Sequence, residues 1–68
     1  MKLKWKHDGG SIRASRPKED GWYAISGHHK YWWVEIVSDK IGSYSLGWAP
    51  TIDIAKKRCQ DLEDYYSK

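Results

Sequence analysis

Apolar and polar residues alternate with a period of two through most of the first 48 residues. In residues 2–7, KLKWKH, the lysines fall on one side and the apolar side chains on the other, which is typical of a half-buried β-strand. Segments rich in Gly, Asp, Pro and Ser separate this run from four similar ones. The pattern predicts strands at residues 2–7, 11–16, 22–26, 31–37 and 44–48.

The period changes after the last predicted strand. Pro50 disfavours helical geometry at the residue before it, and Thr51 is a suitable N-cap for a helix. Apolar residues then recur at helical spacing, at Ala55, Cys59, Leu62 and Tyr66. We therefore expect a helix over residues 52–66. The predicted fold is α+β, a single domain over residues 1–68 in which an antiparallel meander of four or five strands packs on one C-terminal helix.

One helix covers one face of a sheet, so the other face is left to solvent or a partner. Glu35 sets the phase of the fourth strand, because a carboxylate in a small core is costly and should point outward. By the same alternation, the residues expected to point inward are Leu3, Trp5, Ile12, Ala14, Tyr23, Ile25, Trp32, Val34, Ile36, Tyr44, Leu46 and Trp48. Ala24 is expected outside.

The outward face combines basic and aromatic residues. The chain has a formal charge of +3, and its first 18 residues contain six Lys or Arg but a single Asp. The candidate binding residues are Lys2, Lys4, Lys6, Arg13, Trp22, Tyr31 and Trp33. Cations for phosphates beside rings for bases favour a nucleic acid partner. A protein-binding or homodimer surface, or a purely structural role in cross-strand pairing, stay open as alternatives.

The acidic residues of the predicted helix raise a separate question. Asp53 in the first turn favours the helix dipole and can pair with Lys57. Asp61, Glu63 and Asp64 oppose the dipole at the other end and are typical of a solvated helix terminus. Their position slightly favours a contact role for that end.

No metal, cofactor or catalytic site is expected. His28 and His29 are adjacent, and adjacent residues of an extended chain point to opposite sides, so they chelate one ion poorly. They are interpreted as solvent-exposed turn residues. Cys59 lies on the apolar stripe of the helix, which predicts a small buried side chain rather than a nucleophile. We expect a non-enzymatic binding module.

The cysteine count, the apolar runs and the first residues of the chain predict its cellular setting. The single cysteine allows no internal disulfide, which favours a cytoplasmic setting. No apolar run approaches the roughly 20 residues of a membrane span. The start, MKLKWKHD, is basic but has no apolar stretch after it, so we do not expect a signal peptide.

The run YWWVEIV…YSLGWAPTIDIAKKRC carries a resemblance over roughly residues 21–66. It resembles small phage and prophage proteins in which a Trp-rich meander ends in LG, followed by a capping Thr and a helix opening with AK. Its order of elements is also similar to the ethylene-response-factor DNA-binding domain of plants and the arm-binding N-terminal domain of tyrosine integrases. In those domains a three-stranded sheet enters the major groove. The resemblance implies a phage-type protein that contacts nucleic acid.

The sequence departs from those DNA-binding families on its central strands. Trp22, Tyr31, Trp33 and Glu35 stand where those families carry several Arg, so stacking or backbone contact fits better than base readout by Arg. The phage likeness also leaves an alternative, in which the protein inhibits host machinery such as CRISPR or restriction complexes by binding a host protein. The contact would then use the same Trp-rich face or the helix end.

Overall fold

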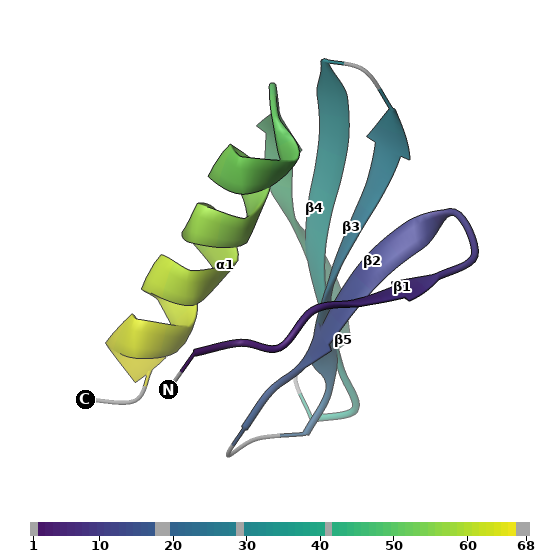
Figure 1. The fold of residues 1–68 in the computed structure, drawn as a ribbon. Helices are drawn as coiled ribbons and strands as arrows, with labels where there is room; N and C mark the ends of the chain where they lie inside the picture. Colours follow the sequence, from purple (N-terminus) through teal and green to yellow (C-terminus); the bar gives the residue numbers. More distant parts are fainter. Residues whose placement is uncertain (1, 18–19, 29, 41, 67–68) are drawn as a thin grey trace.

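Five strands and one helix follow one another along the chain in the computed structural model (Figure 1). The elements are β1 Lys6–Asp8, β2 Ser11–Ser15, β3 Trp22–His28, β4 Tyr31–Ser38, β5 Gly42–Ala49 and α1 Ile52–Tyr66. Each strand pairs antiparallel with the next, so the sheet order is β1-β2-β3-β4-β5. The structure describes residues 2–17, 20–28, 30–40 and 42–66, and the side chains of His28 and Tyr44 lie outside this description. The predicted α+β meander is confirmed, as are the helix bounds.

The N-terminal segment departs from the prediction of a strand over residues 2–7. Only Lys6–Asp8 pair with β2, and residues 2–5 leave the sheet. Figure 1 shows this purple segment running from β1 toward α1. The backbone N–H of Leu3 donates to Oε1 of Gln60 on the helix at 2.8 Å, and the Leu3 side chain is buried. The alternating pattern therefore places Leu3 inside correctly, but it does so at the helix rather than in a paired strand.

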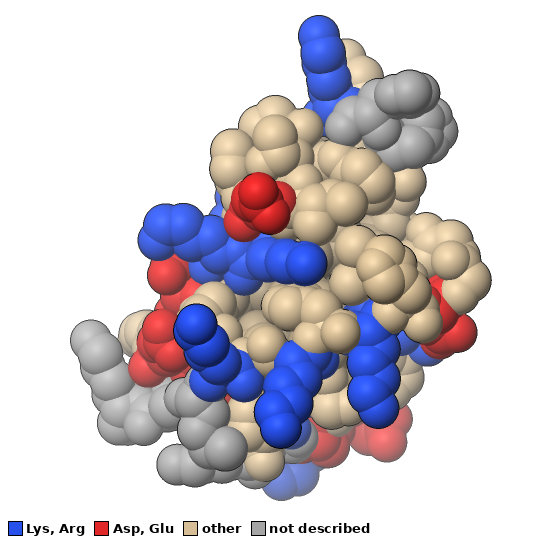
Figure 2. Space-filling view, viewed as in Figure 1, with Lys and Arg blue, Asp and Glu red and all other residues tan. Residues whose placement is uncertain are grey.

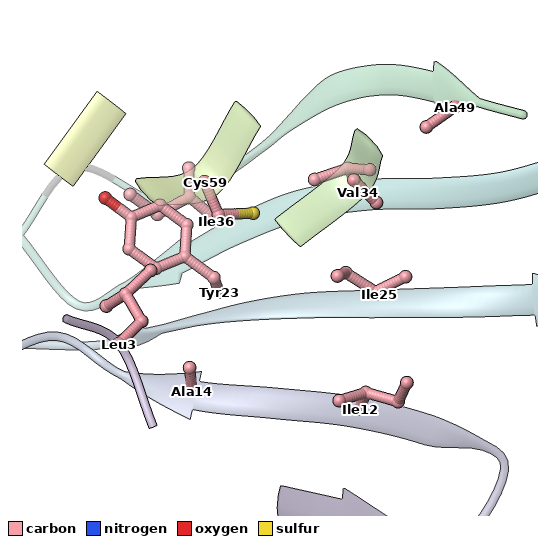
Figure 3. Packing of buried hydrophobic residues seen from close by; sticks show 10 residues of the cluster. Leu3, Ile12, Ala14, Tyr23, Ile25, Val34, Ile36, Ala49 and Cys59 are labelled. Carbon is pink, nitrogen blue, oxygen red and sulfur yellow. The ribbon is translucent and has the colours of Figure 1, made fainter. Parts of the chain in front are cut away.

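The core lies between the sheet and α1 (Figure 3). Side chains of β3 and β4 form its centre and are fully buried, as are Ala55 and Cys59 of the helix. Val34 and Ile36 alternate with Glu35, which therefore points to the other face of the sheet. The predicted phase of β4 is confirmed. Ala24 also points outward but is buried, and its strand partners on the outer face are Arg13 and Glu35. In the described part of the chain, no helix has both the length and the apolar composition to cross a membrane.

A β-bulge in β5 overturns the predicted phase of the last strand. Val34 pairs with Gly47 and Glu35 pairs with Ser45, so Leu46 is the extra residue between them. Leu46 still packs against the core, but Trp48 now opposes Trp33 on the outer face and is 57% exposed. Gly47 has a φ of +94°, which an L side chain rarely adopts. The prediction that Trp48 points inward is therefore wrong, while that for Tyr44 concerns a side chain outside the described residues.

The N-terminal end of α1 is capped as the sequence indicates. The backbone N–H of Ile54 donates to Oγ1 of Thr51 at 3.1 Å, and the N–H of Ala55 donates to the Thr51 carbonyl at 3.1 Å. The predicted pair between Asp53 and Lys57 is replaced by another: the Lys57 ammonium lies 3.2 Å from Asp61. Both partners of this i,i+4 pair are exposed.

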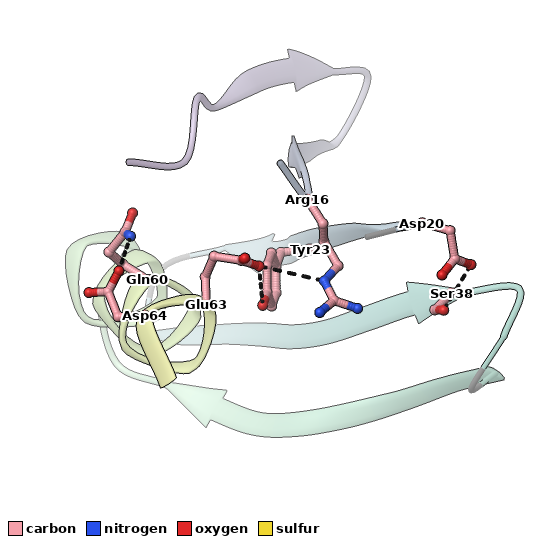
Figure 4. Close-up of polar contacts among 7 residues, drawn as sticks. All are labelled: Arg16, Asp20, Tyr23, Ser38, Gln60, Glu63 and Asp64. Carbon is pink, nitrogen blue, oxygen red and sulfur yellow. Dashed lines mark hydrogen bonds and ion pairs between the residues drawn. The ribbon is translucent and has the colours of Figure 1, made fainter. Parts of the chain in front are cut away.

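The C-terminal end of α1 holds a buried polar network (Figure 4). The Tyr23 hydroxyl donates to Oε1 of Glu63 at 3.0 Å, and Nε of Arg16 lies 3.5 Å from the same oxygen. The Arg16 guanidinium also lies over the ring of Tyr66, 5.3 Å from its centroid. Burial, together with the hydrogen bond to Glu63 and its charge, raises the pKa of Tyr23 above its ordinary value. Glu63 thus joins α1 to β3 and to the residue after β2.

This network corrects the interpretation of the helix end as solvated at Glu63 alone, because Asp61 and Asp64 are exposed as expected. Glu63 is 1% exposed and is a core residue. Asp61 is paired with Lys57, and Asp64 accepts a hydrogen bond from Nε2 of Gln60 at 2.9 Å. All three acidic residues therefore have partners within the chain. A contact role for this end stays a prediction.

Candidate nucleic-acid interface

A basic groove of about 690 Å³ lies where the N-terminal segment and β1 meet β2 and β3. The basic side chains that line it are Lys2, Lys4, Lys6, Arg13 and Arg16. Trp22 contributes an aromatic wall, and Asp8 is the acidic residue among those lining it. Figure 2 shows Lys and Arg side chains gathered at the front of the molecule, where the N-terminal segment runs. The groove therefore concentrates positive charge beside an aromatic ring.

Strand pairing explains how the groove is built. Lys6 and Arg13 are Cα partners across β1 and β2, and Arg13 is the partner of Ala24 across β2 and β3. Paired residues share a face of the sheet, so the two cations stand side by side on the outer face. The guanidinium of Arg13 lies 5.6 Å from the centroid of the Trp22 ring. This cation–π contact holds Arg13 over the sheet.

Asp8 is the acidic side chain among the described residues that line the groove, and it opposes the positive field there. Its Oδ2 lies 3.2 Å from Nη1 of Arg13, and both side chains are about half exposed or more. Exposed ion pairs contribute little net free energy, because water and salt screen them. A phosphate can therefore replace this carboxylate as the partner of Arg13.

A cluster of three aromatic side chains, Tyr31, Trp33 and Trp48, forms a second feature of the outer face. Trp48 is its centre: its ring lies 4.8 Å from Trp33 in a tilted arrangement and 6.4 Å from Tyr31 edge-on, both measured between centroids. Tyr31 is 70% exposed. Aromatic pairs at these separations stabilise one another beyond their burial. We call this cluster the aromatic platform.

The structure therefore divides the predicted binding residues into two groups. Lys2, Lys4, Lys6, Arg13 and Trp22 line the groove, whereas Tyr31 and Trp33 belong to the platform. The Cα partner of Trp33 on β3 is Ser26, four residues from Trp22, which is about 13 Å along a strand. Trp22 thus stands next to the cations rather than beside the other two rings.

Two residues of these features were not predicted from the sequence. Strict alternation places Trp48 in the core because it does not include the bulge, although a Gly inside a strand pattern is a recognised signal for one. Arg16 lines the groove with a side chain that is 6% exposed. Nothing in its local sequence indicates that its partner is Glu63, 47 residues further along.

Cys59, weighed as a nucleophile, lies in the core rather than in the groove. Cys59 is fully buried, and burial raises the pKa of its thiol to about 12, so the thiol is protonated at neutral pH. Among the described residues, no three His, Cys, Asp or Glu gather into a possible metal site. The predicted exposure of His28 and His29 concerns side chains outside the described residues.

Comparison with protein-family models, with curated proteins and with solved structures finds no match to this chain. The likeness to phage proteins and to the two DNA-binding domains therefore stays a prediction.

Proposed function

We propose that this protein binds nucleic acid through the outer face of its sheet, with the basic groove as the phosphate-binding site. The observation that carries this proposal is the groove itself. Lys2, Lys4, Lys6 and Arg13 come from two segments of the chain, and the fold places them around one concave surface. Lysines that serve only solubility can be spread over the surface, whereas these side chains gather around one groove.

The physics of polyanion binding favours this arrangement. A nucleic acid carries condensed counterions, and each phosphate neutralised by Lys or Arg releases them into solution. The formal charge of +3 attracts such a partner from a distance. The exposed lysine ammonium groups reach phosphates on flexible stems, while Arg13 is held in place by Trp22.

The experiment is a titration of fluorescein-labelled 20-mers, single- and double-stranded DNA and RNA, followed by anisotropy between 20 and 300 mM KCl. We expect binding at low salt that weakens steeply as salt rises. The double variant Lys4→Ala with Lys6→Ala should reduce the slope of log K against log salt by about 1.4–1.8, because two phosphate contacts are lost.

The matched control is Lys56→Ala with Lys57→Ala on α1. It removes the same charge, but these two residues do not line the basic groove. Equal effects of the two double variants would show that net charge, not the groove, governs binding. Absence of binding to every oligonucleotide at 20 mM KCl would remove the proposal.

The aromatic platform supports a second candidate function, binding of a protein partner. Exposed Trp and Tyr residues are common at the centres of protein interfaces. In that case the oligonucleotides fail to bind, and a partner protein is captured by the wild type but not by Trp33→Ala. The helix end, where Asp61 and Asp64 are exposed, is the alternative contact for such a partner.

A further inference from the structure

We propose that the nucleic acid is single-stranded, and that its bases stack on the aromatic platform of Tyr31, Trp33 and Trp48 while its phosphates lie in the basic groove. This inference rests on the proposed function and names the class of ligand. It assigns a central role to Trp48, whose ring contacts both other rings of the platform.

The platform presents ring surfaces that unpaired bases can use. Tyr31 and Trp48 are 70% and 57% exposed, and the ring planes of Trp33 and Trp48 are inclined at 59°. The contacts among the three rings fix their orientation before a ligand arrives, so little conformational entropy is lost on binding. Every base has a π-face, whichever base it is, so stacking here would be tolerant of sequence.

A duplex cannot make the same contacts. Its base faces are already stacked on one another, so a protein reads it through hydrogen bonds at base edges and through its phosphates. The outward side chains described on β3 and β4 are Trp22, Ala24, Ser26, Tyr31, Trp33, Glu35 and Val37. This set lacks the Arg, Lys, Asn and Gln that bind purine edges, and Glu35 adds a carboxylate that repels phosphate. The central strands are therefore suited to rings rather than to base edges or a duplex backbone.

The groove and the platform belong to one continuous face. Strand pairing joins Trp48 to Trp33, Trp33 to Ser26, and Ser26 to Ser11 in a row that crosses from β5 to β2. Arg13 lies on the same face two residues along β2 from Ser11. Small serine side chains thus lie between the rings and the cations, and the backbones of Trp48 and Ser11 are about 14 Å apart across three strand spacings. A flexible polyanion that also carries flat rings complements both ends of this path.

The test compares three fluorescein-labelled 20-mers by anisotropy at one salt concentration: oligo(dT), an abasic strand of the same length, and a duplex. The wild type should bind oligo(dT) most tightly, because only this ligand offers both phosphates and unpaired bases. Trp48→Ala should weaken oligo(dT) binding roughly tenfold and leave binding of the abasic strand unaffected. Trp48→Tyr, which keeps a ring, should retain most of the affinity.

Tyr65→Ala is the matched control, since Tyr65 is 65% exposed but lies on α1. The affinity of the Tyr65→Ala variant for oligo(dT) should equal that of the wild type. If the wild type binds the abasic strand or the duplex as tightly as oligo(dT), the inference is overturned while the groove proposal stands. The same conclusion follows if Trp48→Ala binds oligo(dT) like the wild type. If none of the three ligands binds at low salt, both proposals fall together.

Discussion

Replacement of Glu63 by Ala should destabilise this protein more than any exposed charge reversal or deletion on the helix. The carboxylate is 1% exposed and accepts a hydrogen bond from Tyr23, with Arg16 3.5 Å away. In Glu63→Ala the Arg16 guanidinium keeps its charge in a site where its side chain is 6% exposed. The Tyr23 hydroxyl loses its charged acceptor at the same time.

The magnitude follows from the burial of these groups. Breaking a buried ion pair by removing one partner costs about 3–5 kcal/mol, because the remaining charge stays uncompensated. The lost hydrogen bond from Tyr23 is part of this figure rather than an addition to it, since the two contacts share one oxygen. A 68-residue domain has a total free energy of unfolding of about 3–10 kcal/mol. Glu63→Ala should therefore lose about a third or more of the free energy of unfolding.

The assay is urea denaturation followed by far-UV circular dichroism, with the slope m compared between variants. Asp64→Ala is the matched control: it removes the same charge one residue away, at an exposed position, and should cost about 0.5 kcal/mol or less. The combined variant Glu63→Leu, Arg16→Met and Tyr23→Phe should recover most of the loss, because apolar side chains of similar size replace the whole network. A cost below 1 kcal/mol for Glu63→Ala, or no recovery in the combined variant, would refute this reasoning.

Two further predictions concern Cys59 and Gly47. Burial raises the pKa of the Cys59 thiol to about 12 from an ordinary 9.0, so the thiol ionises at lower pH in the unfolded chain than in the folded one. The free energy of unfolding should therefore fall as pH rises from 9, by at most about 1.4 kcal/mol per pH unit. Urea titrations at pH 8, 9 and 10 should show a larger fall in the wild type than in Cys59→Ala, where the raised pKa of Tyr23 still contributes near pH 10. A pH-independent wild type would contradict the prediction. Gly47→Ala should cost about 1–3 kcal/mol through its φ of +94°, since no atom lies within 4 Å of the added Cβ. The same denaturation measures it, and a neutral Gly47→Ala would show that the bulge does not depend on glycine.

Local patterns in the sequence determined most of the fold. The helix bounds were predicted because Thr51, Pro50 and the apolar spacing act within one or two turns. The phase of β4 was predicted because one carboxylate, Glu35, cannot be buried cheaply among Val34 and Ile36. The order of the strands followed from short connections, which make consecutive strands neighbours.

Tertiary structure decided what lies far apart in the chain or interrupts its period. The bulge at Leu46 and Gly47 shifts β5 by one residue, and a shift of one residue moves a side chain to the opposite face of a sheet. That shift brings Trp48 to the outer face and creates the aromatic platform. Glu63 appeared solvated because its partners, Tyr23 and Arg16, lie more than 35 residues away. Sequence periodicity reports which side chains favour burial, whereas only the packed chain supplies the partner that makes a buried carboxylate stable.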